Sequence, residues 1–338
     1  MPSKPLWARA LLCLALLWAF IPWPGAQAVS PAAATQDSPY IAFASRDLKL
    51  YLKKSDKTVP LDRIPAGALL SVTAYEPGWL QVGWGEQTGY VPAKYTERLQ
   101  PRDPLSGPLP HVPMEQALAL VLKDASFQPE GFRGPVRVPA GSLLTLRRIQ
   151  GDQAYFAYTR FRDMQALPLA RLGLTPIVPW RQARPGDLIS AFTSFYSTSR
   201  TRRLNIGRMA NLVLSCQRLD GQVIEPGQAF SYNAVCGPYT RQNGYALAPI
   251  IAAGGADGYG GGTCQVSTTL YNNVLRLPMA VDEHHWHSQN GVSYVPAGFD
   301  ATVGDKWDLV FRSLLPYAVR ITAKAQGGLL TICVYRAE

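Results

Sequence analysis

The last 150 residues carry apolar positions at helical spacing, followed by alternating runs. Apolar side chains recur every three or four residues over 204–219 and again over about 265–276, and each stretch predicts one amphipathic helix. Pro278 ends the second helix. Alternating apolar runs at 292–295, 309–314, 319–323 and 329–335 then predict strands. This half of the chain therefore reads as an α+β domain.

The first half of the chain shows period-two alternation and an internal repeat. Short alternating runs broken by Gly and Pro predict small antiparallel β-structure. The segment IPAGALLSV at 64–72 returns as VPAGSLLTL at 138–146. We match 50–53 with 120–123, 79–82 with 153–156, and 98–99 with 171–172. The sequence therefore predicts two copies of one small unit.

Composition shifts set the predicted boundaries. Lys4 and Arg9 precede an apolar run over 10–21, and Ala26-Gln27-Ala28 supplies small residues for cleavage, which predicts a secretory signal peptide at 1–28. An uncleaved anchor is the weaker alternative, and no later segment is apolar enough to span a bilayer. Proline-rich stretches separate the predicted units, which are 38–100, 112–173, a linker at 174–187, and 188–338. We expect an exported protein located outside the cell, in the cell wall or in the periplasm, with no integral membrane domain.

Charge and cysteines limit the possible partners. The formal net charge is +10, and it is spread along the chain. Outside the cell, spread basicity suits anionic wall polymers rather than nucleic acid, although an ordinary basic surface is an equal alternative. Four cysteines follow the predicted signal, and they allow three complete pairings. We favour a bridge from Cys216 to Cys236 and expect Cys333 to be a small buried hydrophobic residue.

Candidate chemistry is confined to one stretch. Gly260, Gly261 and Gly262 precede Cys264 at the predicted start of a helix, where the dipole and unpaired N–H groups favour a thiolate. The cluster Glu283-His284-His285-Trp286-His287 follows. One hypothesis is a thiol hydrolase or acyl transferase with Cys264 as nucleophile and N–H groups around 262–265 stabilising the oxyanion. Its base is His287 or His285, oriented by Asp300.

Two alternatives compete with the enzyme hypothesis. In a non-catalytic binding module, the glycines permit tight turns or hold a carboxylate, Gln265, Ser267 and Thr268 hydrogen-bond a peptide, and Cys264 is packed or bridged. A metal site would use Cys264 with the three histidines, but a second paired ligand motif is missing, so we expect no metal and no cofactor. If residues 283–287 are extended, His285 and His287 share a face and His284 points away.

The first repeat resembles bacterial SH3-like domains. The resemblance rests on GWLQV at 78–82 and TGYVP at 88–92, and it covers about 40–100. It implies a small barrel of a kind that commonly binds peptidoglycan or its peptides. Trp79, Trp84 and Tyr90 are nevertheless more simply explained as packing groups of such a barrel. The second copy departs from the pattern, because DMQAL at 163–167 stands where Gly-Tyr-Val is expected.

The last part of the chain, about 190–338, resembles the VanW family. The resemblance rests on an ordered set of motifs: RLNI at 203–206, PGQAFSYN at 226–233, GP at 237–238, GY at 244–245, GGGTCQVSTTLY at 260–271, HS at 287–288, YVPAG at 294–298 and DATV at 300–303. Cys236, and Arg312-Ser313 in place of an Asn, depart from the pattern.

The VanW family takes its name from a member in vancomycin-resistance gene clusters, and the resemblance implies a role in peptidoglycan biology. An amide of a stem peptide is then the expected substrate. The chain order Cys, His, Asp is similar to that of transglutaminase-like cysteine enzymes. The whole is therefore expected to be a multidomain protein, with two small all-β SH3-like barrels followed by an α+β VanW-type domain.

Overall fold

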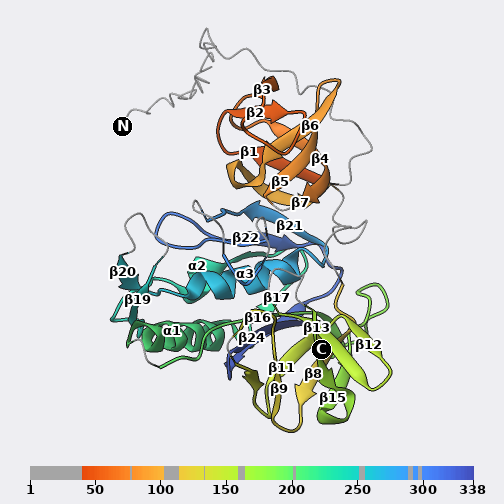
Figure 1. The fold of residues 1–338 in the computed structure, drawn as a ribbon, viewed down its shortest axis with the longest axis vertical. Helices are drawn as coiled ribbons and strands as arrows, with labels where there is room; N and C mark the ends of the chain where they lie inside the picture. Colours follow the sequence, from red (N-terminus) through yellow and green to blue (C-terminus); the bar gives the residue numbers. More distant parts are fainter. Residues whose placement is uncertain are drawn as a thin grey trace, which may run out of the picture.

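The computed structural model describes residues 40–338 except 77, 103–113, 133, 159–163, 201–202, 251–255, 288–291 and 296–298. The predicted signal peptide and most of the first proline-rich linker lie outside the described residues. The described chain forms three groups of elements, one above the other in Figure 1 and each dominated by strands. None of the helices in this part of the chain is long and apolar enough to cross a membrane. The prediction of a mostly β, multidomain protein is confirmed.

The first unit is a single antiparallel sheet of seven strands in the order β3-β2-β6-β5-β4-β1-β7. Its strands are β1 (Tyr40–Ala44), β2 (Leu48–Tyr51), β3 (Pro60–Ile64), β4 (Leu69–Glu76), β5 (Trp79–Trp84), β6 (Gln87–Pro92) and β7 (Thr96–Pro101). Leu80 and Val82 are fully buried, while Trp79 packs edge-on against Tyr51 at 6.0 Å. Since β3 and β7 end the sheet without pairing to each other, the SH3-like barrel stays a prediction.

The second unit spreads its strands over three small sheets. They are β10-β9, β11-β8-β15 and β12-β13-β14, with β8 (Ala117–Val121), β9 (Ala125–Phe127), β10 (Val136–Val138), β11 (Leu143–Leu146), β12 (Arg148–Gln150), β13 (Gln153–Ala157), β14 (Met164–Pro168) and β15 (Leu172–Pro176). Its own apolar core is centred on Phe156, which lies against Phe127 and Phe195.

The two units share the turn that the sequence repeat encodes. The carboxylate of Asp47 accepts the N–H of Ala66 at 2.9 Å, and Asp124 accepts the N–H of Ala140 at 2.8 Å. A short 3₁₀ helix also follows a proline in each unit, η1 (Ala93–Tyr95) and η2 (Leu169–Arg171). Because Asp47 matches Asp124, β2 corresponds to β9, and the predicted match of 50–53 with 120–123 is out of register.

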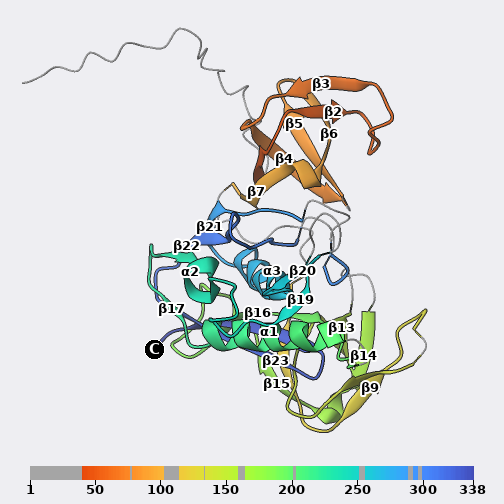
Figure 2. The ribbon, with the colours of Figure 1, turned by 90° about the vertical axis from the view of Figure 1, so that its left-hand side faces the viewer.

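The third unit places helices on a four-stranded sheet of order β16-β24-β23-β17. Further elements are β16 (Leu188–Phe195), α1 (Arg203–Leu219), β17 (Val223–Ile224), β18 (Ala229–Ser231), α2 (Tyr232–Cys236), β19 (Leu247–Pro249), β20 (Asp257–Tyr259), α3 (Thr263–Val274), β21 (Met279–Glu283), β22 (Val310–Ser313), β23 (Val319–Gln326) and β24 (Leu329–Arg336). In this sheet α1 packs on β23 and α3 packs on β16 and β24, while α1 and α3 also contact each other (Figure 2).

Both predicted helices and three of the four predicted strands are confirmed, within two or three residues. The exception is 292–295, which forms no strand. Val292 and Val295 are buried in a loop instead, so their apolar character reports burial rather than pairing in a sheet.

The predicted Cys216–Cys236 bridge is wrong, because Cys216, Cys236, Cys264 and Cys333 are all free thiols. The Cys236 thiol donates to the carbonyl of Ser215 at 3.7 Å. Burial raises the pKa of Cys236 to about 12, which makes it a packing group rather than a reactive one. Cys333 is fully buried in β24, as the sequence predicted.

The first two units are attached to the elements that carry the candidate chemistry. The Tyr271 hydroxyl on α3 donates to the Leu99 carbonyl at 3.1 Å, and the N–H of Val281 on β21 donates to Gln100 at 2.9 Å. From the second unit, buried Glu115 lies 3.8 Å from Arg276, just beyond the end of α3. The N-terminal units thus pack against α3 at both of its sides rather than standing apart.

Candidate functional site

The glycine run is required by the protein's own packing. Gly262 caps α3 with φ of 108°, a conformation that other residues rarely adopt. A Cβ on Gly262 would lie 2.9 Å from Cγ of Arg208, and one on Gly261 would lie 2.6 Å from the Pro249 carbonyl. A Cβ on Gly260 would meet Tyr239 at 2.8 Å. The space beside the glycines is therefore filled by α1, β19 and Tyr239, and the run serves to seat the start of α3.

Cys264 is the second residue of α3, as predicted, and it is a partly exposed thiol, whereas the other three described cysteines are buried. The N–H groups of Thr263 and Gln265 donate to the carbonyls of Gly260 and Gly262 at 3.0 and 2.9 Å. Within the described residues, the N–H of Cys264 has no backbone acceptor. This leaves one donor beside the sulfur for an oxyanion, rather than the whole predicted group.

His287 and Asp300 form a buried pair. Nδ1 of His287 lies 2.5 Å from Oδ2 of Asp300, and the same oxygen accepts the backbone N–H of His287 at 2.9 Å. The two residues are only 5% and 2% exposed. Two bonds to one carboxylate oxygen fix the ring and leave Nε2 as its free nitrogen.

Each residue of the His287–Asp300 pair shifts the pKa of the other. Burial opposes a charge on His287, but the hydrogen bond to Asp300 and the neighbouring Cys264 sulfur together outweigh burial and raise its pKa to about 10. Burial likewise acts to raise the pKa of Asp300, but its bond to His287 prevails and lowers it. At neutral pH, His287 is therefore an imidazolium facing an aspartate.

Cys264 and His287 are neighbours without a well-aligned hydrogen bond. The thiol contributes to the raised pKa of His287, yet Sγ donates to the Val303 carbonyl at 3.4 Å. Nε2 of His287 is buried and has no hydrogen-bond partner among the described residues. Catalytic hydrogen bonds of this kind often tighten only when substrate binds.

The side chains of the other two histidines have partners other than Cys264 and the Asp300 carboxylate. His285 is 3.0 Å from Glu283, and its side chain is 30% exposed. His284 is buried, stacks on Tyr271 at 4.2 Å and contacts the Asp300 carbonyl at 2.8 Å through Nε2. The condition for the expected alternation is not met, because 284–287 form no strand, and His285 and His287 have different partners. Among the described residues, no three His, Cys, Asp or Glu side chains converge in a way that could hold a metal.

Three of the predicted ligand-binding side chains are committed to the protein itself. Ser267 and Thr268 are fully buried, and their hydroxyls bind the backbone of Ala301 at 2.7 and 3.0 Å. Gln265 is buried as well and donates to the Phe195 carbonyl at 2.9 Å. These residues hold the segment after Asp300 and the end of β16 against α3. Their contacts give them a positioning role.

Arg208 on α1 completes the surroundings of Cys264, and the sequence did not single it out. Its guanidinium donates to Oε1 of Gln265 at 2.6 Å. Burial lowers its pKa, partly offset by electrostatic interactions with Tyr294, Tyr196 and Cys264. Nothing in the local pattern distinguishes Arg208 from the other basic residues, because only the tertiary fold brings α1 over the start of α3.

We expect buried His284 to make the stability of the folded protein depend on pH. Its burial lowers its pKa from 6.5 to about 4, despite the bond to the Asp300 carbonyl. Between pH 6.5 and 4 the unfolded chain therefore binds a proton at this histidine, whereas the folded chain does not. As the pH decreases over this range, the free energy of unfolding falls by roughly 3 kcal/mol. We expect His284→Gln to flatten this part of the profile, as followed by denaturant unfolding.

His285→Gln is the matched control for His284→Gln, because the His285 ring is partly exposed and hydrogen-bonded to Glu283. It should keep the acid slope of the parent. If His284→Gln loses stability between pH 6.5 and 4 as steeply as the parent does, buried neutral His284 is not the source.

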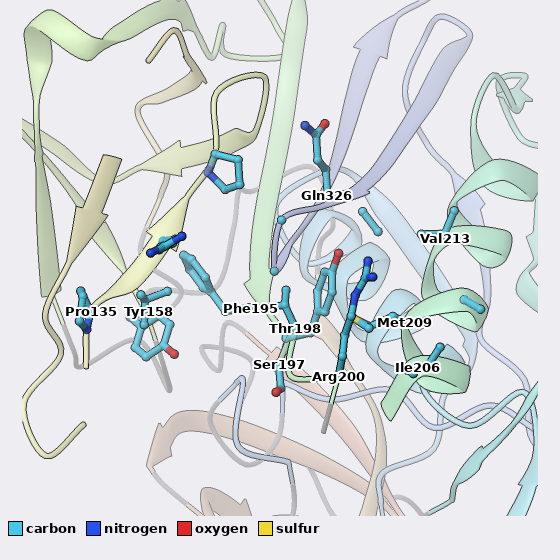
Figure 3. Close-up of a pocket in the computed structure, with 18 of the residues that line it drawn as sticks. Pro135, Tyr158, Phe195, Ser197, Thr198, Arg200, Ile206, Met209, Val213 and Gln326 are labelled. Atoms are coloured by element: carbon cyan, nitrogen blue, oxygen red, sulfur yellow. The ribbon is translucent and has the colours of Figure 1, made fainter. Parts of the chain in front are cut away.

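A cavity of about 1160 Å³ lies near the site but does not contain it. Figure 3 shows Ile206, Met209 and Val213 of α1 on one side and Pro135 and Tyr158 of the second unit on the other. Between them lie Phe195, Ser197, Thr198 and Arg200. None of the predicted site residues lines this groove. It adjoins the site through Phe195, whose carbonyl binds Gln265. Arg137 and Arg200 line it, and no acidic residue does.

Comparison with known proteins identifies the third unit. Residues 207–335 match the family model described as VanW like protein. This segment is a VanW domain. An uncharacterized protein, YoaR of Bacillus subtilis (strain 168), is 36% identical over 154 residues, which cover 44% of this chain and 48% of YoaR. The chain thus spans about half the length of this curated relative. The predicted resemblance of the C-terminal region is confirmed, whereas the SH3-like units stay predictions.

Solved structures add little to this identification. NlpC1 from Trichomonas vaginalis is 12% identical, covers 90% of this chain and 95% of its own, and has a TM-score of 0.17. An NlpC/P60 family protein from Bacillus cereus ATCC 10987 is 11% identical, covers 88% and 99%, and has a TM-score of 0.16. At such TM-scores neither likeness carries an argument about the VanW domain.

Proposed function

We propose that the VanW domain is a thiol-dependent amide hydrolase or acyl transferase of the cell envelope, acting on stem peptides of peptidoglycan. The observation that carries the proposal is the meeting of a reduced, partly exposed Cys264 with the buried His287–Asp300 pair. Cysteine enzymes that cleave amides combine a nucleophilic thiol with an imidazole that a third group orients, and Asp300 would be that group here.

The chemistry divides into two balanced steps. With the proton shared by Cys264 and His287 held on Nε2 of His287, Sγ of Cys264 attacks the amide carbon and forms a C–S bond, the C–N bond breaks, and the amine leaves with that proton. The N–H of Cys264 is placed to stabilise the oxyanion. Water or a second amine then attacks the thioester and gives up a proton to His287, and Sγ departs. Water completes hydrolysis, and an amine completes transfer.

The charge of His287 assigns its first role. Because its pKa is raised to about 10, the resting ring holds the proton that the first step needs. His287 then acts first as the acid that protonates the leaving amine, and in the second step as the base. In this scheme Asp300 orients the ring and stabilises its charge, while His285 takes no part.

The other parts of the chain fit a wall-bound enzyme. The net charge of +10 favours retention on anionic wall polymers. We propose that the two N-terminal units, as SH3-like modules of an exported protein, hold the VanW domain against peptidoglycan. The groove beside Phe195 offers room for a longer ligand close to the site.

Product analysis tests the proposal. The exported protein, incubated with purified muropeptides, should release peptides whose masses show the gain of one water or the exchange of one amine. Unchanged muropeptides, together with co-sedimentation of the protein with intact peptidoglycan, would instead establish the alternative of a non-catalytic binding module.

A further inference from the structure

Arg208 is a cation placed beside the candidate nucleophile without an anion to match it. Among the described residues, no carboxylate lies within ion-pair distance of its guanidinium, and its one hydrogen bond goes to the neutral amide of Gln265. Most of its N–H donors are therefore uncommitted. A largely desolvated guanidinium gains most from a carboxylate, which it can bind through two parallel hydrogen bonds.

The surroundings hold Arg208 in place rather than leaving it mobile. Its Cγ would lie 2.9 Å from a Cβ on Gly262, so the glycine cap of α3 is what admits this side chain. Gln265 is in turn fixed by Ser194 at 3.0 Å and by the Phe195 carbonyl at 2.9 Å. The charge is thus oriented by a buried amide next to the residue that carries the thiol.

We propose that Arg208 binds a carboxylate of the substrate, so that the amide attacked by Cys264 carries a free carboxylate close to the scissile bond. This inference rests on the proposed function and narrows its substrate class to acidic peptides. Peptides whose carboxylates are amidated or otherwise blocked are then poor substrates. The groove beside Phe195 is not needed for this recognition.

Two small alkylating agents test the inference without a known substrate. Iodoacetate and iodoacetamide deliver the same carbon to a thiolate, and they differ in that only iodoacetate carries a carboxylate. We expect Arg208→Gln to slow the alkylation of Cys264 by iodoacetate on the order of tenfold, while the rate with iodoacetamide changes by less than about twofold. Arg208→Lys, which keeps the charge, should restore part of the preference.

The controls separate recognition from structure. Arg63→Gln removes an exposed arginine of the first unit and should leave both rates unchanged. Alkylation of the buried Cys216 and Cys333, measured in the same samples, reports any unfolding of Arg208→Gln. If Arg208→Gln unfolds, the rate of Arg208→Lys with iodoacetate tests the proposal instead. If Arg208→Gln leaves both rates unchanged, or slows both reagents equally, the carboxylate role is overturned. If Cys264 of the parent reacts with neither reagent, the proposed function fails as well.

Discussion

Replacing Cys264 by Ala abolishes the turnover of muropeptides while leaving the fold intact. The thioester cannot form without Sγ, so the rate should fall at least on the order of 10³-fold, to the background. The fold should survive, because the side chain is partly exposed and its hydrogen bond to the Val303 carbonyl is its only polar contact among the described residues. Chromatography of the peptide products measures the rate, and thermal unfolding measures the stability.

Cys333→Ala is the matched control for Cys264→Ala. Cys333 is fully buried in β24, so its truncation costs packing and lowers the unfolding temperature. Its turnover should nevertheless equal that of the parent. If Cys264→Ala retains turnover, the thiol has no part in the mechanism, regardless of the role of His287.

Asp300→Asn has the second-largest expected effect, a fall in turnover of about 10²- to 10⁴-fold at neutral pH. The carboxylate is what holds the pKa of His287 at about 10 against burial. With a neutral amide in its place, burial is opposed only by the weaker contributions, and the pKa of His287 falls. The ring then holds its proton less strongly at neutral pH and protonates the leaving amine less effectively.

The pH profile separates this account from a loss of structure. A group that must be protonated loses its function as pH rises through its pKa, so parent activity should decline near pH 10. In Asp300→Asn the same decline should move to acid pH. Asp282→Asn, which removes an exposed partner of Arg312, should leave the profile unchanged. An unmoved alkaline limb in Asp300→Asn would contradict the assigned role.

The sequence was most informative where local pattern determines structure. Helical spacing located α1 and α3 and placed Cys264 at a helix start, since amphipathic periodicity and glycine caps are local signals. The repeated turn could be recognised in the sequence because both units form it in the same way, with an Asp carboxylate that accepts a backbone N–H of the turn. The Cys, His, Asp order singled out His287 and Asp300, although it left His285 as an equal candidate base.

The features that could not be predicted from the sequence depend on contacts between residues that are far apart along the chain. His285 pairs with Glu283 rather than with Asp300, and Gly262 is explained by Arg208, which lies on another helix. Buried Glu115 contacts Arg147 and Arg276 from different units, and no periodicity marks such a cluster. The groove likewise exists only where α1 faces the second unit. These features arise from tertiary packing, which spacing alone does not encode.

The most direct test of the account is the rate at which iodoacetamide alkylates each cysteine of the folded, exported protein at neutral pH, followed by peptide mass spectrometry. The account predicts selective labelling of Cys264 over Cys216, Cys236 and Cys333, because its thiol is partly exposed and theirs are buried. A Cys264 found in a disulfide, or one labelled no faster than the buried thiols, would contradict it.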